Sequence, residues 1–102
     1  MTIHVVETGD TMDVSLEGVH PIPLLEADKV RALLLNLEAG QAVAPCRMSV
    51  AVLYYVIEGR GRLNVGDEQA FLQAGSLVSV PAGAVRTISA AERTRILAVQ
   101  VA

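Results

Sequence analysis

The chain has 102 residues, of which 52% are hydrophobic and 19% are charged, and its net charge is −3. This length gives one domain, and the hydrophobic share excludes intrinsic disorder. The net charge is weakly negative and the sequence contains no run of basic residues, which argues against a nucleic-acid partner. No apolar run approaches the roughly 18 residues that span a bilayer, so we expect no membrane partner either.

The cysteine count and the first residues bear on the compartment. A single cysteine, Cys46, cannot form an internal disulfide. The N-terminus lacks the basic and apolar regions of a signal peptide. Together these features predict a reducing cytoplasm.

In chain order, the sequence predicts short extended segments separated by turns. The interval Glu17–Asp28 contains Pro21 and Pro23, which forbid a helix and favour an extended surface segment. The apolar stretch Val30–Leu37 predicts a strand. From Gly40 onward, glycines and prolines punctuate the chain regularly. The strands predicted after that point are Met48–Glu58, Arg62–Val65, Gln69–Leu72, Leu77–Val80, Val85–Ser89 and Arg93–Val101.

This succession of short strands is typical of an antiparallel sandwich or barrel. Gly66-Asp67 indicates a tight hairpin between two of the strands. The last strand, Arg93–Val101, becomes apolar on both faces toward its end. We therefore expect that strand to be covered on both sides.

Two spaced motifs carry a family resemblance. Residues 40–61 resemble the first cupin motif, G-x5-H-x-H-x3,4-E-x6-G, with Gly40 and Gly59 at the glycine positions. Residues 75–90 resemble the second motif, G-x5-P-x-G-x2-H-x3-N, with Gly75, Pro81 and Gly83 at the backbone positions. The resemblance implies one all-β domain over residues 1–102, a double-stranded β-helix or jelly-roll barrel.

The same alignment replaces the residues that hold a metal ion in the family. The four positions that resemble the ligands His, His, Glu and His are occupied by Cys46, Met48, Val52 and Arg86. Valine has no donor atom, and a guanidinium has no lone pair and would repel a divalent cation. We therefore expect no metal and no cofactor.

The residues that remain in the barrel suggest a metal-free site. If Cys46 faces inward, strand alternation places Met48, Val52 and Tyr54 on the same side. Arg86 would enter from a facing strand and anchor a small anion such as a carboxylate. We take metal-independent binding of a small molecule by these five residues as the working hypothesis.

Three other interpretations stay open. Cys46 and Met48 could be ordinary core packing, with Arg86 solvated at the barrel mouth or paired with Glu58 or another carboxylate. The protein could be a metal-free enzyme, an isomerase, a lyase or a thiol-dependent enzyme, that uses Cys46 with Arg86 or Tyr54. Cys46 and Met48 also suit Cu(I), although two ligands are too few. Neither His4 nor His20 belongs to a motif.

The outward side of the long central strand predicts a protein partner. Ala51, Leu53, Tyr55 and Ile57 would all point outward, and four consecutive apolar residues on that side need a cover. The N-terminal strand or a second subunit would supply it. Because small cupins commonly pair, the resemblance favours a homodimer.

Overall fold

The structure is a computed structural model that describes residues 3, 5–7 and 21–102. The predictions that concern His4 and His20 lie outside the described residues. Nine strands run through the described part of the chain. They are β1 (Ile22–Glu26), β2 (Val30–Leu37), β3 (Ala42–Arg47), β4 (Ala51–Glu58), β5 (Arg60–Val65), β6 (Glu68–Gln73), β7 (Leu77–Val80), β8 (Val85–Ala90) and β9 (Thr94–Val101).

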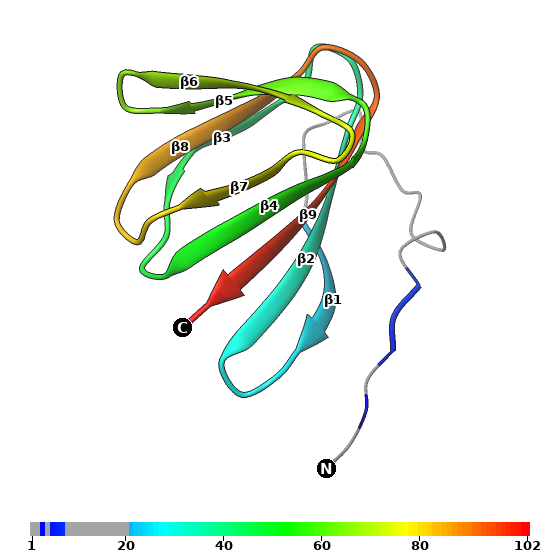
Figure 1. The fold of residues 1–102 in the computed structure, drawn as a ribbon, viewed down its shortest axis with the longest axis vertical. Helices are drawn as coiled ribbons and strands as arrows, with labels where there is room; N and C mark the ends of the chain where they lie inside the picture. The colour runs from blue at the N-terminus through cyan, green and yellow to red at the C-terminus, as the bar shows by residue number, and fades with distance from the viewer. Residues whose placement is uncertain (1–2, 4, 8–20) are drawn as a thin grey trace.

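The strands form two antiparallel sheets, which confirms the all-β prediction. One sheet has the order β1-β2-β9-β4-β7, and the other has the order β3-β8-β5-β6. Figure 1 shows the two sheets facing each other, with the described N-terminal residues beyond β1. The described residues contain no helix that is long and apolar enough to cross a membrane.

The hydrophobic core lies between the two sheets. Alternation along β4 turns Val52, Tyr54 and Val56 inward and leaves Leu53 and Tyr55 partly exposed, as predicted. The buried hydrophobic cluster contains Leu33, Leu35, Leu37, Val52, Tyr54, Val56, Leu63, Leu72, Val80, Ile88, Ala90, Ile96 and Ala98. Both sheets contribute to it.

Two strands were missed by the sequence analysis, and both contain proline. β1 includes Pro23 and β3 includes Pro45, and each strand lies at the edge of its sheet. An edge position tolerates proline because one side of the strand has no ladder bonds to lose. The register of each strand also shifts beside its proline, between Pro23 and Leu25 and between Val43 and Cys46.

One strand boundary was predicted wrongly, and the prediction that the last strand is covered on both faces holds for all but its end. The predicted strand Met48–Glu58 begins only at Ala51, because residues 48–50 form the bend that joins β3 to β4. The last strand is covered on both faces as predicted from Thr94 to Ala98, and the cover is lost only at its end. Val101 at the end is 40% exposed, because its neighbours in the sheet are the rim residues Val30 and Ala51.

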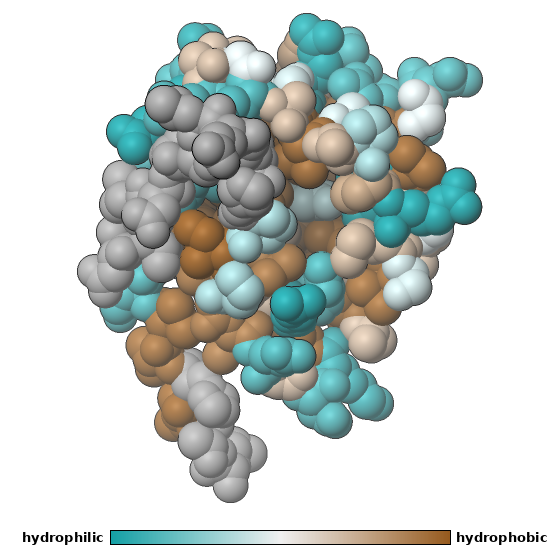
Figure 2. All heavy atoms as spheres, turned by 180° about the vertical axis from the view of Figure 1, so that it is seen from behind, coloured by the Kyte–Doolittle hydropathy of each residue, from teal (hydrophilic) through white to brown (hydrophobic). Residues whose placement is uncertain are grey.

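The outer side of the five-stranded sheet carries a continuous apolar surface. Tyr55 pairs with Leu77 on one side and Leu97 on the other, and Leu53 and Val101 extend the surface toward Val30. We call the exposed members of this surface the outer apolar face: Val30, Leu53, Tyr55, Leu77 and Val101. From behind, hydrophobic residues reach the surface in several places between polar ones (Figure 2).

Candidate functional site

Two of the predicted site residues are direct neighbours in the smaller sheet. Cys46 of β3 pairs with Arg86 of β8, and Val65 of β5 pairs with Arg86 from the other side. Residues directly opposite in an antiparallel pair point to the same face, so these three side chains share the inner face of the sheet. The two sequence motifs thus meet across one strand pair.

The five predicted residues are buried to different depths. Val52, Tyr54 and Arg86 are almost completely buried, with 2%, 5% and 1% of each residue exposed. Cys46 and Met48 are only half-buried, and Met48 packs against the edge of the core. The structure therefore brings Tyr54 and Arg86 together in the interior, while Cys46 and Met48 lie nearer the rim than predicted.

The guanidinium of Arg86 is held by neutral acceptors. Its Nε and Nη2 donate to the carbonyl oxygen of Ala84 at 3.1 and 2.9 Å, and Nη2 also donates to the carbonyl of Pro81 at 3.4 Å. Its Nη1 donates to the Tyr54 hydroxyl at 3.3 Å. Pro81 and Ala84 belong to the connection between β7 and β8, so Arg86 ties this connection to β4 through Tyr54.

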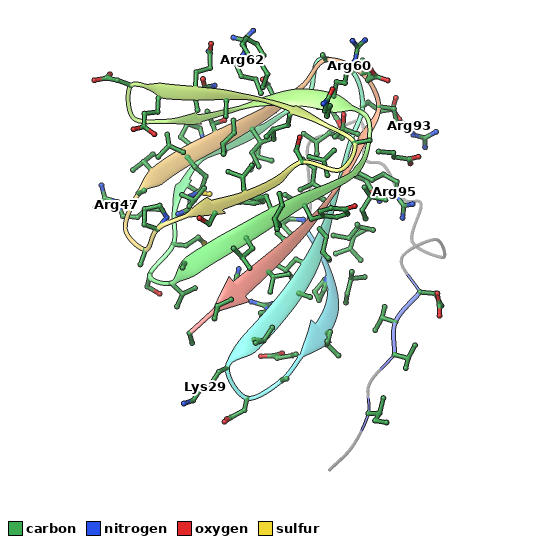
Figure 3. All side chains as sticks on the ribbon, in the orientation of Figure 1. Lys29, Arg47, Arg60, Arg62, Arg93 and Arg95 are labelled. Carbon is green, nitrogen blue, oxygen red and sulfur yellow. The ribbon has the colours of Figure 1, made fainter. Side chains whose placement is uncertain are left out.

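No carboxylate balances the charge of Arg86 within the described residues. The ion pairs found there are Arg60–Glu92, Arg93–Glu38 and Arg95–Glu58. Because Arg86 is buried and has none of these partners, it is neither solvated at the mouth nor paired with Glu58, and the packing interpretation is wrong on this point. By contrast, Figure 3 shows Arg47, Arg60, Arg62 and Arg93 pointing outward from the sheets.

The chemistry of this centre follows from counting donors. A guanidinium has five N–H donors, and four of those on Arg86 are used by Ala84, Pro81 and Tyr54. One N–H on Nη1 and the O–H of Tyr54 remain. Because desolvating a cation costs several kcal/mol, hydrogen bonds from neutral groups offset that cost only in part. Arg86 and Tyr54 therefore form a buried positive centre whose charge these neutral acceptors compensate only in part.

The donor set does not suit a divalent metal. No group of three or more His, Cys, Asp or Glu side chains comes together in the part of the chain that the structure describes. Val52 is a buried aliphatic side chain, and the cation of Arg86 stands directly across from Cys46. The sulfur atoms of Cys46 and Met48 are two soft donors without a third among the described residues.

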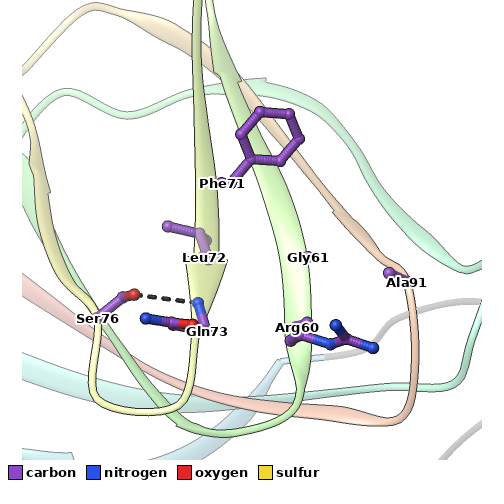
Figure 4. Close-up of a pocket in the computed structure, with 7 residues that line it drawn as sticks. All are labelled: Arg60, Gly61, Phe71, Leu72, Gln73, Ser76 and Ala91. Carbon is purple, nitrogen blue, oxygen red and sulfur yellow. Dashed lines mark hydrogen bonds between the residues drawn. The ribbon is translucent and has the colours of Figure 1, made fainter.

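Three of the hollows on the described surface are lined by none of the five predicted residues. The largest of these three has a volume of about 540 Å³ and is drawn in Figure 4. A second, of about 220 Å³, shares Gly61, Phe71 and Ala91 with it. The third, the mouth crevice, has a volume of about 140 Å³ and is lined by Leu63, Val65, Glu68, Gln69, Ala70, Val78, Ser79, Val80 and Pro81. Val65 and Pro81 in this lining are both neighbours of Arg86.

The sequence analysis missed the surroundings of Phe71. Phe71 is the chain's one phenylalanine, and it is 77% exposed on the outer face of the smaller sheet, beside the largest hollow. The signal was present in the sequence, because Phe71 alternates with Ala70 and Leu72, which face inward.

Comparison with known proteins gives the family. A search of curated proteins found no match. A structure described as TT1209 from Thermus thermophilus has a TM-score of 0.87 at 24% identity, covering 97% of each chain. An uncharacterised Klebsiella pneumoniae protein with a double-stranded β-helix domain has a TM-score of 0.89 at 16% identity, covering 98% of this chain and 90% of its own.

A cupin superfamily protein from Desulfitobacterium hafniense gives a TM-score of 0.83 at 18% identity, covering 99% of this chain and 93% of its own. At these identities the likeness shows the fold alone. The model of the cupin domain matches residues 33–100, which include both motifs and every residue of the Arg86 centre. The chain therefore belongs to the cupin family.

Proposed function

We propose that the protein binds a small anionic molecule in the barrel without a metal ion, with Arg86 and Tyr54 as the anchor. The observation that carries this proposal is the buried cation of Arg86, which has no carboxylate partner in residues 3, 5–7 and 21–102. An anion would supply the missing charge and accept the two remaining donors in a fork geometry. A carboxylate has two oxygens, one for each of these donors.

The surroundings of the anchor define the class of ligand. Val52 and the half-buried Cys46 and Met48 give apolar, polarisable walls around the cation. The mouth crevice is the route of approach, because Val65 and Pro81 belong both to its lining and to the contacts of Arg86. A short aliphatic carboxylate meets these requirements. In the cytoplasm, which we propose as the compartment, Cys46 stays a thiol.

The enzyme alternative has less support. Cys46 and Arg86 are opposite each other, as a thiol-dependent isomerase or lyase would need. A cysteine nucleophile also needs a base, and no hydrogen bond joins Cys46 to a His, Asp or Glu among the described residues. We therefore infer binding rather than catalysis.

Thermal unfolding in acetate, formate or phosphate, compared with chloride at equal ionic strength, tests the proposal. We expect acetate to raise the melting temperature of the wild type, because the ligand binds only the folded state. Tyr54→Phe removes one donor and should reduce the rise, and Arg86→Met should abolish it. Tyr55→Phe is the matched control, because Tyr55 points outward and is 42% exposed. An equal rise in all four proteins, or no rise with any of the anions, would contradict the proposal.

A further inference from the structure

The outer edge of β6 offers unpaired main-chain groups. Gly66 has a φ of +57° and Asp67 has no positive φ, so the β5–β6 hairpin turns through a type II′ turn. The flanking pair Val65–Glu68 is therefore hydrogen-bonded, and bonding to β5 continues at every second residue. Gln69, Phe71 and Gln73 of β6 then point their N–H and C=O groups away from β5.

One of these three residues is already satisfied. The N–H of Gln73 donates to Ser76 Oγ at 3.0 Å, and its carbonyl accepts from the N–H of Ser76 at 2.9 Å. These bonds agree with the assigned direction of Gln73. No strand pairs with the outer edge of β6 within the described residues. Gln69 and Phe71 thus present two N–H and two C=O groups that another extended chain can pair with.

The space beside this edge selects an aliphatic side chain. A residue that pairs opposite Ala70 points inward with Ala70, toward the mouth crevice. The crevice has a volume of about 140 Å³, and its lining includes the aliphatic side chains of Leu63, Val78 and Val80. Glu68 and Gln69 of β6 also belong to the lining. This crevice has room for one branched aliphatic side chain.

The outer side of the same edge selects a negative charge. Residues opposite Gln69 and Phe71 point outward, next to the exposed ring of Phe71. The guanidinium of Arg62 lies over that ring, 5.6 Å from its centroid, and so leans from β5 toward the open edge. Arg62 has no carboxylate partner in the described ranges, and Figure 3 shows it on the outer side of the hairpin. Its charge complements an acidic side chain.

We propose that β6 docks an extended segment of another protein that carries an acidic, an aliphatic and an acidic residue in succession. The two acidic residues face Gln69 and Phe71, and the aliphatic residue enters the mouth crevice opposite Ala70. Main-chain hydrogen bonds to β6 hold the added strand, and the crevice and Arg62 determine which side chains the bound segment carries. This site shares the mouth crevice with the proposed approach to the anchor formed by Arg86 and Tyr54, but the main-chain groups of β6 and the side chain of Arg62 belong to it alone. Its test is carried out without added carboxylate or phosphate salts, so the result does not depend on anion binding.

Titration with a synthetic peptide tests the docking site. The probe is acetyl-Thr-Thr-Glu-Val-Glu-Thr-Thr-amide, whose palindromic order presents the same side chains in either strand direction. Followed by amide NMR and hydrogen exchange, it should shift and protect the amides of Gln69 and Phe71. The amide of Gln73 is the internal control, because it is already bonded to Ser76. The matched peptide with Lys in place of Glu should bind about ten-fold more weakly.

Two variants separate the contributions. Arg62→Gln should lower the affinity for the Glu peptide several-fold and make it equal to the affinity for the Lys peptide. Arg93→Gln, which changes an exposed arginine paired with Glu38, should leave both affinities unchanged. Phe71→Pro removes an N–H that makes no bond to β5, so the protein should still fold but should no longer bind the peptide. The unchanged amide spectrum of the other strands verifies folding.

Three outcomes would overturn the proposal. They are the absence of binding at millimolar peptide, equal binding of the Glu and Lys peptides, and shifts located away from β6. If the amides of Gln69 and Phe71 instead shift with protein concentration alone, the occupant of the edge is a second copy of this chain and not an acidic partner.

Discussion

The buried charge of Arg86 destabilises the fold, whereas the proposed binding of an anion requires that charge. Its burial costs desolvation energy, and its hydrogen bonds to Ala84, Pro81 and Tyr54 offset part of that cost. A methionine at this position would fill most of the volume with no charge to desolvate. The carbonyls of Ala84 and Pro81 take part in bonds that are only partly buried, so water can replace the lost donors.

We therefore predict that Arg86→Met changes the free energy of unfolding by no more than about 1 kcal/mol, in either direction. Urea denaturation of both proteins measures the difference. A loss of about 3 kcal/mol or more would identify Arg86 as a structural clamp of the β7–β8 connection. The case for an anion anchor would then lose its main support.

At the scale of the elements, the turn between β4 and β5 depends on a glycine. Gly59 has a φ of +95°, and a Cβ atom there would collide with the backbone carbonyl of Arg93 and with Thr94. Gly40 has a similar φ of +86° but nothing within 4 Å of its Cβ position. An alanine at Gly40 would therefore meet only backbone strain, whereas an alanine at Gly59 would meet both backbone strain and a steric collision.

Replacing each glycine by alanine should show this difference. Gly40→Ala should cost about 1 kcal/mol, since only the left-handed conformation is penalised. Gly59→Ala should cost about 3 kcal/mol or more, because backbone atoms must also move. Chemical denaturation of the two variants supplies both values, and equal costs would show that the collision relaxes freely.

The sequence predicted the elements that alternate or that end at glycines. Val30–Leu37 is the strand that was expected, and Val52 and Tyr54 were correctly assigned to the inward side of their strand. β3 escaped prediction because Pro45 and its register shift break the pattern that marks a strand. Proline can be read as a turn or as an edge strand, and only the sheet order decides between them.

The candidate site was predictable in its members but not in its contacts. Alternation and the two motifs named Cys46, Tyr54 and Arg86 as inward residues. The bond between Arg86 and Tyr54 joins strands of different sheets, and the way the two sheets pack cannot be read from one strand's periodicity. Along β6, every second residue bonds to β5, and the residues between them point their N–H and C=O groups to the open edge. A hydrophobic pattern does not show which residues belong to which set.

At the scale of the whole molecule, the outer apolar face needs a partner. Its five members, Val30, Leu53, Tyr55, Leu77 and Val101, range from 37% to 67% exposed and are joined through the ladders of β2, β9, β4 and β7. Contiguous apolar surface of this kind marks an interaction site. A second copy of the chain is the partner we predict, because a two-fold axis buries the same apolar face of both copies.

Light scattering with size-exclusion chromatography should return twice the 10.8 kDa of the chain. Leu53→Arg places a charge near the centre of the outer apolar face and should convert the dimer to monomer, because an unpaired charge cannot be buried there. Phe71→Arg is the matched control, since it changes an exposed apolar residue on the other sheet and should leave the dimer intact. A wild type that elutes as monomer at working concentration would refute the interface. Dissociation by Phe71→Arg alone would move the interface from the outer apolar face to β6.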